Sequence, residues 1–469
     1  MENKAFRHYA HEFADWMADY LEQIENYPVK SQVEPGNIFS QIPDLAPVKG
    51  ESMEDIMNDF RNIILPGMTH WQSPNFFAYF PANSSYPSVL AEMLIAAMGA
   101  QAMKWETSPA ATELEEKVMN WLKAMTGLPE YFHGVIQDTA STATLTAILN
   151  AREKTSEYIV NEQGFCHSGT FRVYCSTETH SSIEKAVKIA GFGSRNLVKV
   201  GVDKDFRMDP VLLQSAITDD LKAGNVPVCV VATLGTTGVT AVDSLEEIGE
   251  ICARHKVWLH VDAAFAGSAL ILPEFRWMIK GIEYADSFVF NPHKWLFTNF
   301  DCSAFFIKDK LSLLRTLQLV PEYLRTQNQG QVNDYCDWGI PLGRRFRALK
   351  LWFVLRSFGL ESLQAKLRQH ISLAQELAQQ ILQEEQFELM APVTMNLVCF
   401  RLKPKGVEDQ ADLNRINETL LKKINTSGKA YMSHTKINGS FTIRMVIANT
   451  YVERRHVEQA WKLVQVVSR

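Results

Sequence analysis

One lysine in an apolar setting is the feature of the sequence most suited to chemistry. Lys294 lies in the stretch FNPHKWLF, residues 290–297, among aromatic and aliphatic side chains. Removing an ammonium group from water is costly, so lysine is rarely buried without a partner. Burial also lowers the pKa of an amine and makes it a better nucleophile. The sequence therefore predicts that Lys294 is a reagent rather than a surface charge.

An aspartate precedes this lysine at the end of another apolar run. Asp262 follows VWLHV and opens the segment DAAFAG, whose small residues let a flat ligand approach. An aspartate and a lysine at neighbouring strand ends can also form a structural ion pair, because such networks are common. From the spacing alone, both interpretations are open.

Three further strand ends carry groups that could hold a cofactor. Thr139, Ala140 and Ser141 follow the run VIQ and open a helix, whose amino terminus can bind phosphate, although such residues cap most helices. His180 follows RVYCS, and Thr237 follows VPVCVVAT. Pyridoxal 5′-phosphate (PLP) needs this set: an amine for a Schiff base, an acid that keeps its pyridine nitrogen protonated, and a phosphate site. The sequence predicts PLP and no metal.

The elements that must position these residues alternate between apolar strands and amphipathic helices. Seven strand-like runs occur from about residue 135 to 310: VIQ, RVYCS, NLVKV, VPVCVVATLG, VWLHVDAAF, ADSFVFN and DCSAFFI. This alternation predicts an α/β fold with a mostly parallel sheet covered by helices on both faces. Ligands of such sheets bind at the carboxyl ends of the strands.

The flanking regions predict further elements. Helical spacing of apolar residues from Phe6 to Ile24 predicts an amphipathic helix, followed by a connector with four prolines. Asn438-Gly439 predicts a hairpin near the end of the chain, and a polar stretch from Pro321 predicts a lid or a disordered segment. Three domains are expected: residues 1–85, helices and a connector that pack on a partner subunit; residues 86–365, the large α/β domain; and residues 366–469, a small α+β domain.

Composition limits the possible partners. The net charge is −6 without a long basic run, so nucleic acid is not expected as a partner. The longest apolar stretch is interrupted by Glu92, so no membrane span is expected. Seven scattered cysteines without a CxxC pair predict reduced core thiols and a cytoplasmic protein.

Several long sequence blocks carry a resemblance to a known family. In chain order they are HWQSPNFFAYFP, TSPAATELE, THSSIEKA, HVDAAFAGSA, FNPHKW, NFDCSA and IPLGRRFRALKLWFVLR. They resemble the group II PLP-dependent decarboxylases, specifically the aromatic-L-amino-acid decarboxylases. The resemblance implies an aspartate-aminotransferase-type large domain (PLP fold type I) with a seven-stranded sheet. It also implies a homodimer whose sites draw on both chains.

The resemblance implies catalytic roles for four residues. Lys294 matches the Schiff-base lysine, Asp262 the partner of the pyridine nitrogen, and His180 the histidine that stacks on the cofactor ring. Tyr323 matches the lid tyrosine, and either Tyr323 or His180 would return a proton to Cα. The implied cofactor-binding residues are Ala140, Ser141, His180, Thr237, Asp262, Ala264, Asn291, His293 and Lys294.

The implied reaction converts an aromatic L-amino acid to its arylalkylamine and CO₂. An alternative on the same scaffold is an aldehyde synthase, but that activity tends to accompany loss of the lid tyrosine or the ring histidine, and this chain keeps Tyr323 and His180. A decarboxylase for another amino acid, and an inactive dimeric binding module, are further alternatives. An intact Lys294 and Asp262 argue against the last.

The expected substrate site is rich in aromatic rings. In the family, glycine at the position of Gly343 tends to accompany bulky aromatic substrates, whereas serine there accompanies histidine or smaller phenolic substrates. Ala82 and Met103 depart from the threonine and phenylalanine that animal members usually carry, so the ranking of catechol, phenol and indole stays open. The candidate substrate-binding residues are Trp71, Tyr79, Phe80, Ala82, Met103 and Gly343.

Overall fold

The computed structural model of the chain describes residues 1–165, 169–319 and 330–469. The chain divides into two compact units. The large unit comprises residues 82–369 and 391–395, and the small unit comprises residues 1–81, 370–390 and 396–469. The predicted division into three domains stays a prediction.

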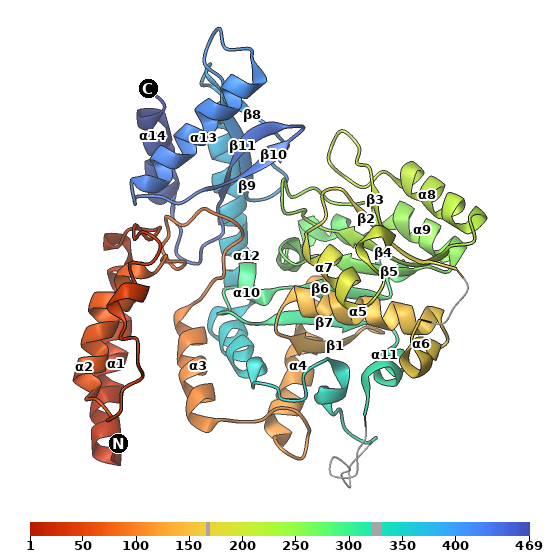
Figure 1. Cartoon of the computed structure of the whole chain (residues 1–469), viewed down its shortest axis with the longest axis horizontal. Coiled ribbons are helices and arrows are strands. Elements are labelled where there is room, and N and C mark those ends of the chain that lie inside the picture. The colour runs from red at the N-terminus through yellow and green to blue at the C-terminus, as the bar shows by residue number, and fades with distance from the viewer. Residues whose placement is uncertain (166–168, 320–329) are drawn as a thin grey trace. The chain divides into compact units, whose positions relative to one another are not determined.

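The large unit is built on the seven-stranded sheet that the sequence predicts. The strand order is β1-β7-β6-β5-β4-β2-β3 (Figure 1). Its strands are β1 (His133–Gln137), β2 (Phe171–Ser176), β3 (Leu197–Val200), β4 (Val226–Thr233), β5 (Trp258–Asp262), β6 (Ser287–Phe290) and β7 (Ser303–Ile307). Only β7 is antiparallel to its neighbours, β1 and β6. The other six strands therefore run in one direction, and their carboxyl ends share one edge.

The strands are apolar because both faces of the sheet are covered. Every residue of β5 is buried, as is every residue of β4 after the first. The helix α5 (Ala140–Thr155) contacts β4, β5, β6 and β7, and its buried alanines, Ala143, Ala147 and Ala151, allow a close approach. The remaining helices of this unit are α3 (Tyr86–Met98), α4 (Pro109–Thr126), α6 (Ile159–Gln163), α7 (Ser182–Ile189), α8 (Pro210–Lys222), α9 (Leu245–His255), α10 (Pro292–Trp295) and α11 (Lys310–Leu317).

A buried ion pair fixes the segment after Gly343 to the edge of this sheet. The guanidinium of Arg344 lies 2.6 Å from the Glu115 carboxylate and donates to the carbonyl of Ile136 on β1 at 2.8 Å. Glu115 also accepts the backbone N–H of Ile136 at 2.8 Å. Breaking a buried pair of this kind costs about 3–5 kcal/mol, because one charge is left without its partner.

The small unit holds an antiparallel sheet of order β10-β11-β9-β8. Its strands are β8 (Phe387–Leu389), β9 (Leu397–Leu402), β10 (Ser433–Ile437) and β11 (Ser440–Val446), and its helices include α1 (Asn3–Glu22), α2 (Met53–Asp59), α13 (Gln410–Thr426) and α14 (Arg454–Val467). The predicted hairpin is confirmed, with φ of 48° at Asn438 and 81° at Gly439. The predicted first helix is confirmed as α1.

One long helix contains a non-helical residue. α12 spans Arg347–Leu382. Gly359, with φ of 67° and ψ of 164°, is its non-helical residue, so helical structure resumes directly after it.

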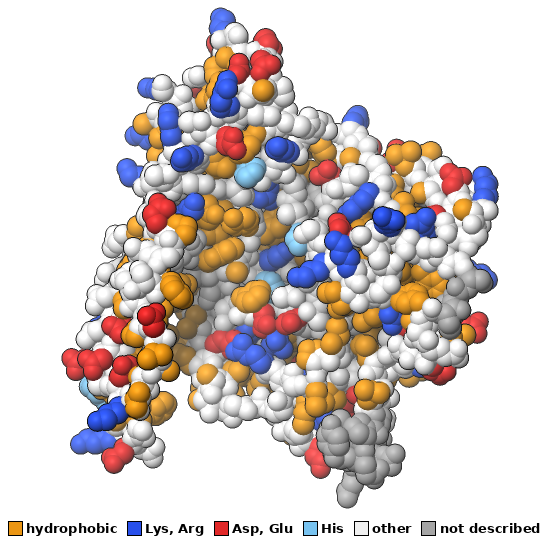
Figure 2. All heavy atoms as spheres, viewed as in Figure 1, with side chains coloured by type: hydrophobic (Ala, Val, Ile, Leu, Met, Phe, Trp, Pro, Cys, Tyr) orange, Lys and Arg blue, Asp and Glu red, His pale blue; other side chains and the backbone are white. Residues whose placement is uncertain are grey.

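The surface carries charges of both signs. Lys and Arg side chains are interspersed with Asp and Glu on the face shown in Figure 2. Within the described ranges, no helix has the length and apolar character needed to cross a membrane. The six described cysteines, at positions 175, 229, 252, 302, 336 and 399, are buried free thiols.

Candidate active site

The lysine that the sequence singles out lies just beyond the carboxyl end of β6. Lys294 is in the one-turn helix α10, and Asp262 is the last residue of the neighbouring strand β5. The Ala264 N–H donates to the Asp262 carboxylate at 3.0 Å, and the Asn291 N–H donates to the carbonyl of Ala264 at 3.0 Å. The Lys294 N–H donates to the carbonyl of Asn291 at 2.9 Å. These links join the lysine turn to the aspartate loop.

Three ionisable side chains influence one another at this edge. Burial lowers the pKa of the Lys294 amine, and the Asp262 carboxylate partly opposes this by favouring the ammonium form. Burial and the charge of Lys294 lower the pKa of His180, whereas Asp262 raises it. The structure therefore brings Lys294, Asp262 and His180 close enough together for their charges to interact.

Hydrogen bonds orient the His180 ring. The Ser182 N–H donates to Nδ1 of His180 at 3.1 Å, and the Ser182 hydroxyl lies 2.7 Å from the same atom. Because Nδ1 accepts a backbone N–H, the hydrogen-bond network assigns the proton of the neutral ring to Nε2. His180 itself is exposed, so its ring face and Nε2 are accessible to a ligand.

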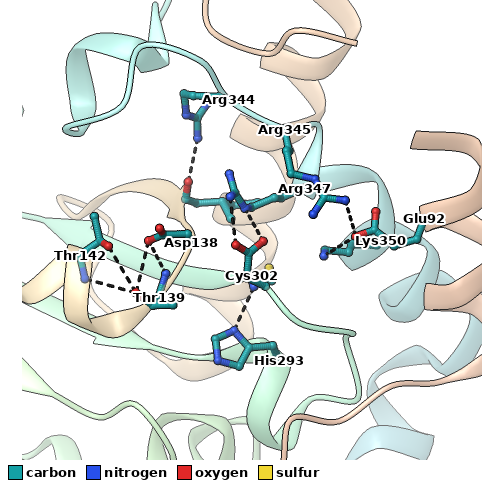
Figure 3. A network of polar contacts seen from close by, with 12 residues as sticks. Glu92, Asp138, Thr139, Thr142, His293, Cys302, Arg344, Arg345, Arg347 and Lys350 are labelled. Atoms are coloured by element: carbon teal, nitrogen blue, oxygen red, sulfur yellow. Dashed lines mark hydrogen bonds and ion pairs between the residues drawn. The ribbon is translucent and has the colours of Figure 1, made fainter. Parts of the chain in front are cut away.

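His293 is held as a neutral hydrogen-bond donor. Burial and the charge of Lys294 lower its pKa to about 3. The Cys302 N–H donates to its Nδ1 at 2.9 Å (Figure 3), which assigns the remaining proton to Nε2. The neighbouring Asn291 carboxamide oxygen accepts the Ser303 hydroxyl. Both side chains therefore have fixed orientations with N–H groups to offer.

Two residues separate the end of β1 from the start of α5. Thr139 caps this 16-residue helix, and its hydroxyl accepts the Thr142 N–H at 3.4 Å (Figure 3). Ala140 is buried and Ser141 is exposed. The first N–H groups of a helix lack partners within the helix and favour an anion such as phosphate.

A cationic network supports the loop that carries Cys302. The Arg347 guanidinium binds both oxygens of Asp301, at 2.8 and 3.1 Å. The amine of Lys350 lies 2.9 Å from the carboxylate of Glu92 (Figure 3). Arg347 and Lys350 occur in the sequence only within the block IPLGRRFRALKLWFVLR, where no local pattern indicates their partners.

Three other predicted residues, Thr237, Met103 and Gly343, each lie in different surroundings. Thr237 is exposed in the turn after β4. The carbonyl of Met103 accepts the Cys336 N–H at 2.9 Å, beside a buried pair between Lys104 and Asp334 at 3.0 Å. An added Cβ at Gly343 would lie 3.4 Å from the Gln101 carboxamide.

The predicted aromatic residues lie in the small unit. Trp71 stacks on Tyr79 with ring centroids 5.9 Å apart, and the Tyr79 hydroxyl lies 3.1 Å from that of Tyr431. The Arg444 guanidinium lies 5.5 Å from the Phe80 ring. Ala82 is the first residue of the large unit, and Tyr323 lies outside the described residues.

The donor set at the edge of the large sheet fits PLP. It offers an amine with a lowered pKa at Lys294, a carboxylate at Asp262, an oriented imidazole at His180 and a helix amino terminus for a phosphate. Residues 35–403 match the family model of the pyridoxal-dependent decarboxylase conserved domain.

The chain belongs to the pyridoxal-dependent decarboxylase family.

Similar proteins align with nearly the whole length of this chain. Tyrosine decarboxylase 2 of Narcissus pseudonarcissus is 45% identical, over 99% of this chain and 94% of that protein. Phenylacetaldehyde synthase of Arabidopsis thaliana is also 45% identical, over 99% and 96%. The crystal structure of Catharanthus roseus tryptophan decarboxylase in complex with L-tryptophan has a TM-score of 0.94 and 40% identity, over 100% of this chain and 98% of that one. The expected family, type I fold and PLP cofactor are thus confirmed.

The charge on Asp262 should set the titration of Lys294. In the decarboxylase freed of cofactor, ¹³C-dimethylated Lys294 should titrate below the ordinary range of a lysine amine. Asp262→Asn should lower the pKa of Lys294 further, because burial would then be opposed by no carboxylate at that position. NMR titration measures both.

Asp219→Asn is the matched control, because Asp219 pairs with exposed Lys222 at 3.5 Å. It should leave the pKa of Lys294 unchanged. An unchanged or raised pKa of Lys294 in Asp262→Asn would contradict this account of the site.

Proposed function

We propose that the chain decarboxylates an aromatic L-amino acid to the corresponding arylalkylamine and CO₂. The observation that carries the proposal is a lysine of lowered pKa beside an aspartate carboxylate at the strand ends of a pyridoxal-dependent decarboxylase. Two relatives that align over 99% of the chain are named tyrosine decarboxylase and tryptophan decarboxylase. Their names support an aromatic substrate.

Five residues of the chain would have distinct roles in this reaction. When bound, PLP supplies an electron sink for the electron pair that departing CO₂ leaves behind. Lys294 would hold the cofactor through its amine, which a low pKa favours because the amine is then unprotonated. Asp262 would keep a proton on the pyridine nitrogen. His180 would pack against the ring, and Ala264 and Thr237 would line it.

The phosphate would be held by neutral donors. The N–H groups of Ala140 and Ser141 begin α5, and His293 and Asn291 contribute side-chain N–H groups. His293 stays neutral at physiological pH because burial lowers its pKa to about 3. We assign these four residues to phosphate binding on that ground.

After CO₂ leaves, a proton must reach Cα. Nε2 of His180 carries a proton in the assigned tautomer, and Tyr323 offers a phenol by family resemblance. We assign this step to one of the two. A positioned acid of this kind contributes about 10²–10⁴-fold to the rate.

An aldehyde synthase is a second candidate with a specific observation behind it. A phenylacetaldehyde synthase is as similar as the tyrosine decarboxylase, at 45% identity. The crystal structure of Rhodiola rosea 4-hydroxyphenylacetaldehyde synthase has a TM-score of 0.93 and 36% identity. We favour amine formation because the chain keeps His180 and Tyr323.

We assign substrate binding to six residues. Aromatic packing among Trp71, Tyr79 and Tyr431 supports a substrate that carries a ring. Gly343 has no side chain, which would leave room for a large substrate. The assigned residues are Trp71, Tyr79, Phe80, Ala82, Met103 and Gly343.

The products of turnover test the proposed reaction. The purified protein with PLP is incubated with L-tyrosine, L-DOPA, L-tryptophan, L-phenylalanine, L-histidine and L-glutamate, while amine, CO₂ and peroxide are measured. We expect one amine per CO₂ from an aromatic substrate, with little peroxide. His180→Asn should lower kcat by about 10²–10⁴-fold if His180 is the proton donor.

Two results would overturn the proposal. Peroxide and aldehyde formed in step with CO₂ would identify an aldehyde synthase. Amine formed faster from L-histidine or L-glutamate than from every aromatic substrate would place the chain among decarboxylases of another specificity.

We further propose that the functional unit is a homodimer. Helix α3 exposes an apolar face at helical spacing: Tyr86, Leu90, Met93, Leu94 and Met98 are each between 39% and 57% exposed. A contiguous apolar surface of this kind is typical of a protein interface. In the small unit, α1 has no buried residue although it carries several aromatic side chains, as expected for a helix that packs on a second copy of the chain.

Changing the α3 face should dissociate the dimer. Leu90→Asp with Leu94→Asp should convert a species of twice 53.2 kDa into one of 53.2 kDa in sedimentation velocity. Leu212→Asp, on the exposed side of α8, is the control and should remain dimeric. A wild-type protein that sediments as a monomer, or a dimer that survives the double substitution, would sink this proposal.

We also assign the chain to the cytoplasm. The six free thiols among the described residues suit a reducing compartment. Cell fractionation checks the assignment, and recovery in an oxidising compartment would contradict it.

A further inference from the structure

The helix that carries Lys294 is too short to satisfy its own carbonyl groups. α10 has four residues, and the last carbonyls of any helix lack partners within it. The carbonyl of Pro292 accepts the Leu296 N–H at 3.0 Å. The carbonyls of His293 and Lys294 come next, and they must find partners outside the helix.

Both of these carbonyls bind the same residue. The Asn83 N–H donates to the carbonyl of His293 at 2.8 Å, and the Asn83 carboxamide donates to the carbonyl of Lys294 at 2.5 Å. Asn83 is fully buried, with 0% of its surface exposed. One buried residue thus holds the backbone of His293 through its own backbone N–H and the backbone of Lys294 through its side chain.

The segment that carries Asn83 is itself anchored. The Ser85 hydroxyl donates to the carbonyl of Phe297 at 2.7 Å, and the Ser85 N–H donates to the Ser88 hydroxyl at 3.0 Å at the start of α3. Residues 83–85 therefore form a strap across the lysine turn that ends in a capped helix. Because α3 anchors the strap, the strap cannot simply move with the lysine turn, and it can therefore hold the turn in place.

We propose that Asn83 is a positioning residue for Lys294. Its carboxamide holds the carbonyl of Lys294 so that the side-chain amine returns to one place each time it has been released. The inference rests on the proposed role of Lys294 as the cofactor lysine. It adds a residue from a different part of the chain, which acts on the lysine backbone rather than on any ligand.

The test compares Asn83→Ala with a matched control. Asn396 in the small unit is also fully buried, and its carboxamide donates to the carbonyl of Ile447 at 2.9 Å. Both alanine variants lose one buried hydrogen bond to a backbone carbonyl, so both should lose similar thermal stability. Only Asn83→Ala should change the behaviour of Lys294.

Three readouts separate positioning from stability. The first is the rate at which PLP binds covalently to the protein freed of cofactor, followed by the absorption band of the lysine-bound form. We expect this rate to fall about tenfold in Asn83→Ala and to stay within about twofold of wild type in Asn396→Ala. The second is the circular dichroism of that band, which should weaken only in Asn83→Ala. The third is the thermal midpoint, which should fall in both.

The outcomes are distinguishable from failure of the proposed function. A wild-type protein without the band, or with a band that survives Lys294→Ala, would overturn the role of Lys294 itself. A normal band in wild type, with equal binding rates and dichroism in the two asparagine variants, would show that Asn83 is only a structural residue. Asn83→Asp, which keeps the shape but removes the donor, should behave like Asn83→Ala; wild-type behaviour would overturn the proposal.

Discussion

The site depends on the free-energy cost of holding an amine away from water. Burial disfavours the ammonium form of Lys294, and one carboxylate, Asp262, partly offsets this. The balance leaves the amine with a lowered pKa, which suits a nucleophile that must be unprotonated when it reacts. The fold has to bury Lys294 and hold Asp262 close enough for its charge to act on the amine. The parallel strands β5 and β6, which pair through Asp262 and Val289, do so by ending at the same edge.

The backbone around the lysine is held as firmly as its charge. Polar groups of a buried turn must be paired, and each partner comes from a different segment of the large unit. Ala264 accepts the N–H of Asn291 from the aspartate loop, Cys302 binds His293 through its N–H, and Asn83 binds the last carbonyls. The loop of Cys302 is fixed in turn by the ion pair between Asp301 and Arg347. Rigidity at the reactive residue thus comes from converging loops rather than from the length of its own helix.

The sequence could predict the parts of this site that depend on local pattern. Apolar runs alternating with amphipathic helices predicted the sheet, because buried parallel strands and surface helices have different periods. Lys294 and Asp262 were found since strand ends carry ligands in such folds. The Asn438-Gly439 turn was predicted because both positions need positive φ.

Long-range pairing was beyond the reach of the sequence. Asn83 looks like an ordinary loop residue until the structure places its carboxamide on the Lys294 carbonyl. The charged partners of Glu115 and Lys104, Arg344 and Asp334, lie more than two hundred positions away along the chain. α12 resumes after Gly359, because one residue of positive φ need not end a packed helix. Contacts of this kind are set by tertiary packing, which leaves no local pattern.

The most direct measurement locates the covalent attachment of the cofactor. The protein with PLP is treated with borohydride, which reduces a Schiff base to a stable amine, and is then digested and analysed by mass spectrometry. The account predicts a single phosphopyridoxyl group on the peptide that contains FNPHKW, with the added mass on Lys294. Attachment to another lysine, or no attachment in a protein that binds PLP, would contradict the central role given to this residue.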